Sequence, residues 1–222
     1  MRVQMPFGFL VTFSILASVV PFTAHAADPF GEIEIREWNV EYGGLPRDPD
    51  AVSDDEVWFV GQVGDYIGRL NPKTGAFFKR DLEDEPGPHN LIVGPDGIVW
   101  YAGNLLGYIG RYDPQTDQID KIAMPNDAAR DPHTLMFDAD NRFIWFTVQN
   151  GNFIGRLDPQ SHDVDLIKVP TPRARPYGIK QAPDGTLWIA LLAPTNWPRL
   201  IRKLLNCVNM PCPMVRARAG LP

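Results

Sequence analysis

Two histidines and a tyrosine occupy one repeated position of the chain. His89, His133 and Tyr177 each follow a proline, and successive members are 44 residues apart. Because an imidazole exchanges its proton near neutral pH, His89 and His133 are candidate general bases. The structural alternative is that these side chains cap backbone carbonyls at repeated turns. A third histidine, His162, follows the Asp158-Pro159 turn and is expected on the solvated surface.

A tryptophan repeat shows which elements must position these side chains. Each of the first three tryptophans is followed by the phrase aromatic-Ile-Gly-Arg, and a turn such as Pro95-Asp96-Gly97 precedes the tryptophan. We expect each tryptophan to pack between neighbouring sheets. We expect each Gly-Arg pair to allow close sheet packing and to place an ion pair. The intervals between successive tryptophans are 42, 45 and 43 residues, and the repeated tryptophans are Trp58, Trp100, Trp145 and Trp188.

One period of this repeat predicts four short strands. Apolar or alternating runs occupy residues 91–93, 98–101, 107–112 and 118–123, and Gly97 suits a hairpin turn between the first two. The rival interpretation is a helical repeat, but proline and glycine recur too often for its helices. Four antiparallel strands in about 43 residues are typical of a β-propeller blade, so the fold class is predicted to be all-β.

The repeats account for about four blades. Residues 49–192 hold three full blades and the first two strands of a fourth, and residues 33–40 are predicted to add one strand before the first blade. Such an incomplete ring would leave apolar faces and strand edges uncovered. The sequence therefore predicts aggregation or self-association through the open blade edges.

Residues 1–26 have the pattern of a secretory signal peptide. Arg2 precedes an apolar run at residues 7–22, and Ala24-His25-Ala26 is a small-x-small cleavage site. A membrane anchor is the alternative, but the run is short and interrupted by proline, and no other apolar run of spanning length follows. The mature chain is thus expected to be exported, either to the periplasm or out of the cell.

Composition excludes some partners. The chain has 21 Lys+Arg against 27 Asp+Glu, which argues against the clustered bases of a nucleic-acid or anionic-membrane surface. Its 2 cysteines are too few for a disulfide framework.

Residues 193–222 differ in character from the repeats. This basic tail has no acidic residue, and it holds both cysteines, Cys207 and Cys212. It could be a docking arm, or the Cys-x4-Cys spacing could bind a metal or form a disulfide. A third interpretation is that the tail is a frameshifted remnant of a longer propeller, because a neighbouring reading frame can encode the missing third strand. Sequencing the gene tests this hypothesis.

The repeated phrase resembles the virginiamycin B lyase (streptogramin lyase) family. The phrase is Pro-His-x-Leu, Pro-Asp-Gly, Trp-(Phe/Tyr) and Ile-Gly-Arg-(Leu/Tyr)-Asp-Pro, and the resemblance covers residues 31–192. It implies a ring of about seven blades with an active site over the central channel. It also implies a carbon–oxygen lyase that depends on Mg²⁺ and opens the ester of a cyclic depsipeptide antibiotic by elimination.

The resemblance also implies site residues. His133 would be the general base, and His89 and Tyr177 would contact the substrate or a metal. Elimination needs such a base together with a cation that stabilises the enolate-like charge. The family's metal-binding glutamate lies four residues after the blade tryptophan. Neutral amides bind Mg²⁺ far less well than carboxylates, so the amides that this chain has at the same position are expected to contact the substrate. They are Gln62, Asn104 and Gln149.

Two further functions stay open. The amides favour a non-catalytic exported propeller that binds a ligand or a protein partner through the channel mouth. An inactive truncated fragment is the remaining alternative.

Overall fold

The structure is a computed structural model that describes residues 34–192, Arg202–Lys203 and Val215–Ala217. The signal-peptide prediction for residues 1–26 and most of the tail lie outside the described residues, so the boundaries at residues 26 and 192 stay predictions. The chain divides into two compact units, Met1–Glu37 and Trp38–Pro222. In the first unit, the described residues contain an ion pair of 2.6 Å between Arg36 and Glu34.

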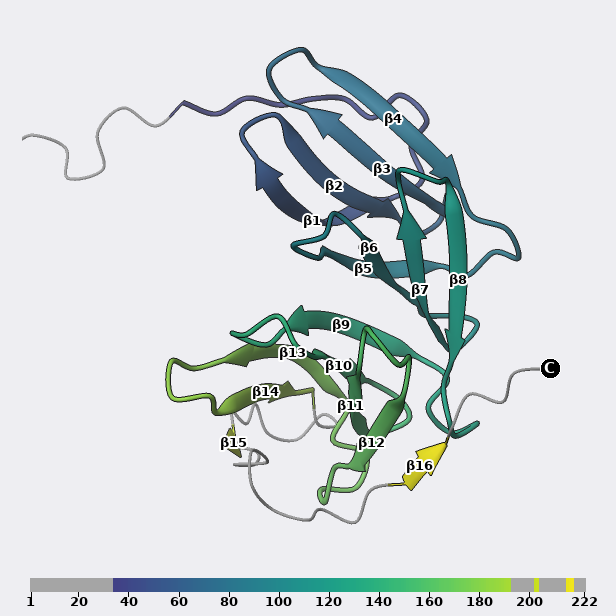
Figure 1. The fold of residues 1–222 in the computed structure, drawn as a ribbon, viewed down its shortest axis with the longest axis vertical. Coiled ribbons are helices and arrows are strands. Elements are labelled where there is room, and N and C mark those ends of the chain that lie inside the picture. Colours follow the sequence, from purple (N-terminus) through teal and green to yellow (C-terminus); the bar gives the residue numbers. More distant parts are fainter. Residues whose placement is uncertain (1–33, 193–201, 204–214, 218–222) are drawn as a thin grey trace, which may run out of the picture. The chain divides into compact units, whose positions relative to one another are not determined.

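The second unit is built only from antiparallel strands in its described part, as predicted (Figure 1). Strands adjacent in the chain pair as neighbours, so each of the first two sheets is a simple meander. The first sheet consists of β1 (Pro46–Ser53), β2 (Glu56–Gly61), β3 (Tyr66–Asn71) and β4 (Ala76–Asp81). The second sheet consists of β5 (Pro88–Val93), β6 (Val99–Gly103), β7 (Tyr108–Asp113) and β8 (Gln118–Ala123).

The third and fourth sheets recruit short strands from the tail. The third sheet has the order β16-β12-β11-β10-β9, and the fourth has the order β13-β14-β15. Thus β15 stands where the third strand of the fourth blade was expected. The third sheet consists of β9 (Pro132–Phe137), β10 (Ile144–Val148), β11 (Phe153–Leu157), β12 (Val164–Lys168) and β16 (Val215–Ala217), and the fourth of β13 (Pro176–Gln181), β14 (Leu187–Leu191) and β15 (Arg202–Lys203).

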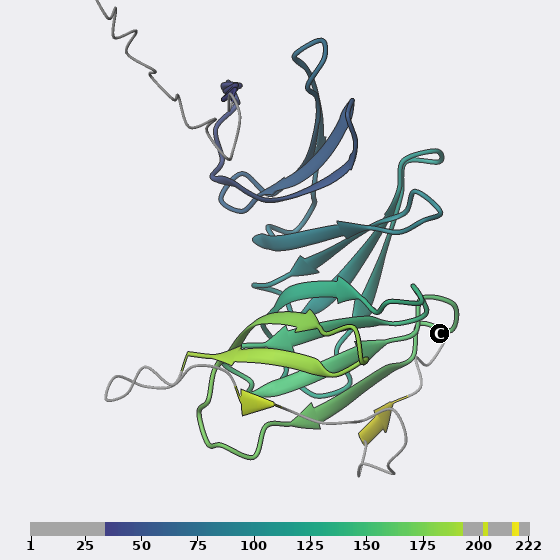
Figure 2. The same cartoon turned by 90° about the vertical axis from the view of Figure 1, so that its left-hand side faces the viewer.

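The four sheets follow one another as propeller blades do. The first strand of each sheet neighbours the first strand of the next, so that β1 packs beside β5, β5 beside β9 and β9 beside β13 (Figure 2). Side chains of Asp50 and Asn90 reinforce this order, because they accept hydrogen bonds from Val93 N–H (2.7 Å) and Leu135 N–H (2.8 Å) in the next sheet. The four first strands therefore surround one side of a common channel. No helix among the described residues is long and apolar enough to cross a membrane.

The predicted extra strand at residues 33–40 is absent from residues 34–40. A strand needs a partner for its backbone groups, and Ile35 in this segment is instead largely exposed. Residues 38–45 cover the first sheet through side chains. The Tyr42 ring lies 5.0 Å from the Tyr66 ring, and the Tyr66 hydroxyl donates to the Gly43 carbonyl at 2.6 Å. This cap covers the face of the first sheet that is turned away from the second.

Three of the four repeated tryptophans, Trp58, Trp100 and Trp145, pack between sheets, as predicted. Trp58 joins a core with residues of the second sheet, and Trp100 joins a core with residues of the third. Each of these two is only 2% exposed, whereas Trp188 is 37% exposed. No described sheet follows the fourth in the order of the blades, and Trp188 borders a hollow that Pro49 and Asp50 of β1 also line. The fourth sheet therefore leaves one apolar face open within the described part of the chain.

The Gly-Arg pairs also have the expected structural role. Arg69, Arg111 and Arg156 form ion pairs with Glu56, Asp120 and Asp165. The glycine before each arginine lies against an aromatic ring of the neighbouring strand. A Cβ at Gly110 would overlap the Tyr101 ring.

Replacing Gly110 with alanine should destabilise the fold by about 1–3 kcal/mol, because the added methyl group must displace the fully buried Tyr101 ring. Urea denaturation of the two proteins measures this change. Gly178→Ala is the matched control, because a Cβ at Gly178 meets no atom within 4 Å. Equal losses for both variants would contradict the close-packing role of Gly110.

Candidate functional site

The repeated Pro-His and Pro-Tyr pairs open three consecutive first strands. Pro88 pairs with Gly103, Pro132 with Val148 and Pro176 with Leu191, so β5, β9 and β13 begin at the same end of their sheets. The ring centroids of His89 and His133 are 3.5 Å apart, and those of His133 and Tyr177 are 4.3 Å apart. The predicted convergence of the three side chains is confirmed, with His133 in the middle. Their chemical roles stay predictions.

Hydrogen bonds within the third sheet, and one to the fourth sheet, hold the middle of this cluster. The buried Thr147 hydroxyl on β10 accepts from Thr134 N–H (3.3 Å) and donates to the Tyr177 carbonyl (2.6 Å). The Thr134 hydroxyl lies 3.0 Å from His133 Nδ1. The third and fourth sheets are thus tied together directly beneath His133 and Tyr177.

Arg47 is the fourth member of the repeated position, and the sequence analysis missed it. Pro46 opens β1 opposite Gly61, in the register that Pro88 and Gly103 have in the second sheet. The signal was present, since Pro46 precedes Trp58 by the same number of residues as Pro88 precedes Trp100. Arg47 Nη1 donates to Gln62 Oε1 at 2.7 Å, and Arg47 Nε donates to Asp48 Oδ2 at 3.2 Å.

Burial keeps both histidines neutral. His89 is 7% exposed and His133 is 3% exposed. Desolvation, with smaller contributions from His133 and Arg47, lowers the pKa of His89 to about 3. Desolvation and the charge of Arg47 lower the pKa of His133 to about 4. Both imidazoles therefore have a free lone pair at neutral pH.

One polar atom of the cluster has no hydrogen bond. His89 Nδ1 is buried without a hydrogen-bond partner, although Asp48 Oδ2 lies 3.5 Å away. That carboxylate lacks the geometry of a hydrogen bond, and because Asp48 is over one third exposed, solvent screens its charge. A buried unsatisfied polar atom is costly unless a ligand satisfies it.

The three predicted substrate-binding amides have different surroundings. Gln62 belongs to the cluster through its bond to Arg47. Asn104 Nδ2 donates to the Pro132 carbonyl at 2.9 Å and so supports the strand that carries His133. Gln149 lies in the loop after β10, where its backbone N–H donates to the Asp131 carbonyl at 3.4 Å. Of the three, Gln62 bonds to the side chain that occupies the repeated position on β1.

These residues do not fit a magnesium ion. Mg²⁺ prefers carboxylate oxygens and waters in an octahedral arrangement. The described residues contain no group of three or more His, Cys, Asp or Glu side chains that could hold a metal. At the mouth, the amide oxygen of Gln62 already accepts from a guanidinium, whose positive charge would repel a cation.

A cavity of about 460 Å³ is lined by residues of the four first strands and of β14. Its lining includes Asp50, Asn90, Thr134 and Gly178, and the last three directly follow His89, His133 and Tyr177 in the chain. This volume is within the range of small-molecule sites.

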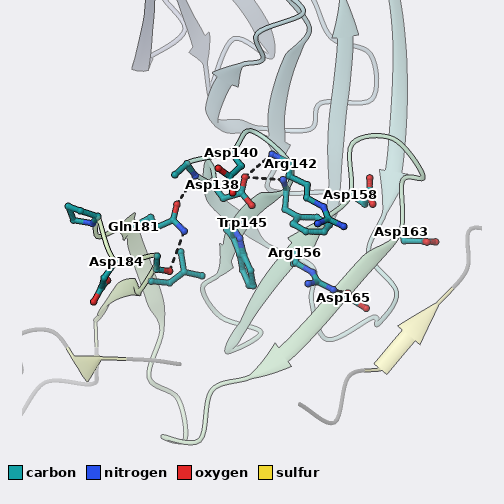
Figure 3. A pocket seen from close by; sticks show the side chains of 15 residues that line it. Asp138, Asp140, Arg142, Trp145, Arg156, Asp158, Asp163, Asp165, Gln181 and Asp184 are labelled. Carbon is teal, nitrogen blue, oxygen red and sulfur yellow. Dashed lines mark hydrogen bonds and ion pairs between the residues drawn. The ribbon is translucent and has the colours of Figure 1, made fainter. Parts of the chain in front are cut away.

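A larger cavity, of about 760 Å³, lies at the hairpins where the first strands of the third and fourth sheets end (Figure 3). Its charged groups serve the fold. Asp138 accepts from two backbone N–H groups of its own turn, Arg156 pairs with Asp165, and Gln181 accepts from Ala139 N–H at 2.7 Å. No histidine, serine or cysteine lines it. We therefore place the candidate site at the histidine end.

His162 corrects one prediction. This side chain is half-buried rather than solvated, and its ring lies 6.1 Å from the Trp100 ring of the preceding sheet. It therefore helps to cover the repeated tryptophan, in agreement with a structural role.

Consecutive antiparallel sheets with a histidine–tyrosine cluster at one channel mouth define a β-propeller with a mouth-centred site. The model of the virginiamycin B lyase family matches residues 9–195, and the chain belongs to this family. No curated protein sequence gives a significant match.

Solved structures of the family have the same fold. Virginiamycin B lyase from Staphylococcus aureus is 26% identical, with a TM-score of 0.65 over 81% of this chain and 57% of that chain. A catalytically inactive histidine-to-alanine variant of that enzyme with quinupristin is 26% identical, with a TM-score of 0.66 over 88% of this chain and 62% of that one. A streptogramin B lyase structure is 23% identical, with a TM-score of 0.65 over 81% and 56%. This chain therefore spans about 56–62% of the length of these structures.

Proposed function

We propose that the protein is a carbon–oxygen lyase that opens a cyclic ester of the streptogramin B type, with His133 as general base. The observation that carries this proposal is the close contact of the His89, His133 and Tyr177 rings, which lie tilted against one another at the channel mouth. The family membership and the inactive histidine variant of the S. aureus enzyme support it.

The reaction is an elimination. His133 takes the proton α to a carbonyl, the electron pair of that C–H bond forms a C=C bond, and the C–O bond of the ester breaks to release a carboxylate. In the tautomer that this step needs, His133 Nδ1–H donates to the Thr134 hydroxyl and Nε2 accepts the substrate proton. His89 and Tyr177 fix the plane of the imidazole from its two sides.

Incubation with a streptogramin B antibiotic tests this function. Elimination opens the ring without changing the mass of the antibiotic, whereas ester hydrolysis adds one water. Chromatography with mass spectrometry and fragmentation distinguishes the two products. An unchanged cyclic substrate after long incubation with folded protein would rule out the lyase.

A binding function without turnover is the second candidate. Exposed apolar side chains stand on the loops around the mouth, where they would contact an apolar ligand or a protein partner: Leu45, Val63, Leu105 and Leu106. Such a module would bind the cyclic antibiotic without opening it.

We also propose that the protein is exported, because residues 1–26 have the pattern of a signal peptide.

We propose that two copies associate through the open face of the fourth sheet. Trp188 and Leu192 are exposed there, and a two-fold contact would cover both faces at once. Sedimentation velocity should detect a dimer whose population falls in Trp188→Gln. A concentration-independent monomer, or a dimer unaffected by Trp188→Gln, would exclude this interface.

A further inference from the structure

We propose that Arg47 makes the channel mouth a carboxylate-binding site, and that its guanidinium is the resident cation there in place of a metal ion. The role of this site in turnover rests on the proposed function, but the binding of a carboxylate does not.

The geometry of the repeat places Arg47 in the cluster. Arg47 holds in β1 the position that His89, His133 and Tyr177 hold in the next three first strands. It is close enough to contribute its charge to the electrostatics of both imidazoles. The four side chains therefore share one mouth.

The side chain of Arg47 is held in place and retains donors. Its Nη1 is fixed by Gln62 and its Nε by Asp48. A guanidinium has five N–H donors, so these two bonds leave three for a ligand. Its side chain is 27% exposed, which keeps it accessible from the mouth while limiting the screening of its charge by water.

The buried His89 Nδ1 atom makes no hydrogen bond, and Asp48 Oδ2, which accepts from Arg47 Nε, lies 3.5 Å from it. The nitrogen lies in the same cluster and belongs to a side chain that is more than nine-tenths buried. As a neutral imidazole, His89 can donate one N–H to a carboxylate oxygen beside the guanidinium. A ligand carboxylate that displaced the partly exposed Asp48 side chain would thus bond both Arg47 and His89.

The chemistry of the proposed reaction needs such a group. Elimination develops negative charge on the ester oxygen and releases a carboxylate. Arginine binds carboxylates through two parallel N–H···O bonds, which a hydrated magnesium ion does not reproduce. The amide at Gln62, where the family resemblance places a metal-binding carboxylate, instead orients this guanidinium.

Benzoate and its neutral analogue benzamide test the inference without turnover. Both are titrated into the full-length protein at constant ionic strength, in buffer freed of metal ions by a chelating resin, and the histidine ring resonances of His89 and His133 are followed by NMR. We expect saturable shifts with benzoate and at least about tenfold weaker binding of benzamide, because a charge-assisted pair is lost.

Arg47→Gln should abolish this preference for benzoate. Arg111→Gln is the matched control, because it removes an arginine paired with Asp120 on the outer strands of the second sheet. Arg47→Lys keeps the charge without the planar fork, and we expect benzoate affinity to fall severalfold; this variant decides the matter if Arg47→Gln does not fold. Unchanged benzoate affinity in the Arg47 variants, or binding that requires added Mg²⁺, would overturn the inference.

Failure of the lyase proposal is distinguishable from failure of this one. A protein that prefers benzoate through Arg47 but leaves the antibiotic cyclic would retain the carboxylate site and lose the proposed reaction. If the protein opens the antibiotic but its Arg47→Gln variant binds benzoate as the wild type does, the proposed reaction stands and the proposed carboxylate site does not.

Discussion

Replacing His133 with alanine is expected to lower kcat/KM for ring opening of a streptogramin B by about 100- to 10,000-fold, the usual contribution of a positioned general base. His133 is the middle member of the cluster, so it is the imidazole with neighbours on both sides. The measurement is the initial rate of formation of the isobaric ring-opened product. Far-UV circular dichroism of the variant confirms that the sheets are retained.

His162→Ala is the matched control for this variant. It removes the other imidazole of the third blade, which is half-buried against Trp100 in the hairpin between β11 and β12. We expect its kcat/KM to stay within about twofold of the wild type if the base assignment is correct. Full activity of His133→Ala would refute that assignment.

The pH profile gives an independent readout of the same base. Since burial and Arg47 lower the pKa of His133 to about 4, its lone pair is available throughout the neutral range. The acidic limb of the kcat/KM profile should therefore lie near pH 4 rather than near 6.5. An acidic limb at the ordinary histidine pKa would show that the titrating base does not have the lowered pKa of His133.

Acidification is expected to destabilise the folded state strongly between about pH 6.5 and 4. In the unfolded chain His89 and His133 take up protons near pH 6.5, whereas in the folded chain their pKa values are about 3 and about 4. The unfolded state thus binds more protons in this window, so the free energy of unfolding falls as pH falls. Within this window each imidazole lowers the free energy of unfolding by roughly 1.4 kcal/mol per pH unit of acidification. Above the histidine pKa of the unfolded chain this dependence on pH is absent.

Urea denaturation at several pH values measures this dependence. Carboxylates also titrate near the acidic end, so the comparison is between the wild type and the double variant His89→Gln, His133→Gln. Glutamine cannot be protonated, and we expect the double variant to lose most of the slope between pH 6.5 and 5. Parallel curves for the two proteins would show that these imidazoles are accessible to protons in the folded state.

Periodicity in the sequence was sufficient to predict the blades. The spacing of Trp58, Trp100 and Trp145 and the Gly-Arg phrase identified the strands and the packing role of both motifs. The constant interval between His89, His133 and Tyr177 predicted that they would converge. These features are local or strictly periodic, so the pattern of one repeat predicts the backbone of the next.

Only the tertiary structure shows which groups contact the cluster of His89, His133 and Tyr177, and what charge these groups carry. Arg47 breaks the residue pattern of its repeated position, and its bond to Gln62 depends on the pairing of β1 with β2. The low pKa values of the histidines arise from burial between sheets, and the same kind of burial turns His162 from a solvated residue into a cover for Trp100. The segment at residues 34–40 has a strand-like alternation but finds no strand to pair with. Periodicity specifies where a residue lies on its blade, whereas contacts, desolvation and charge come from other blades, whose side chains the local pattern does not encode.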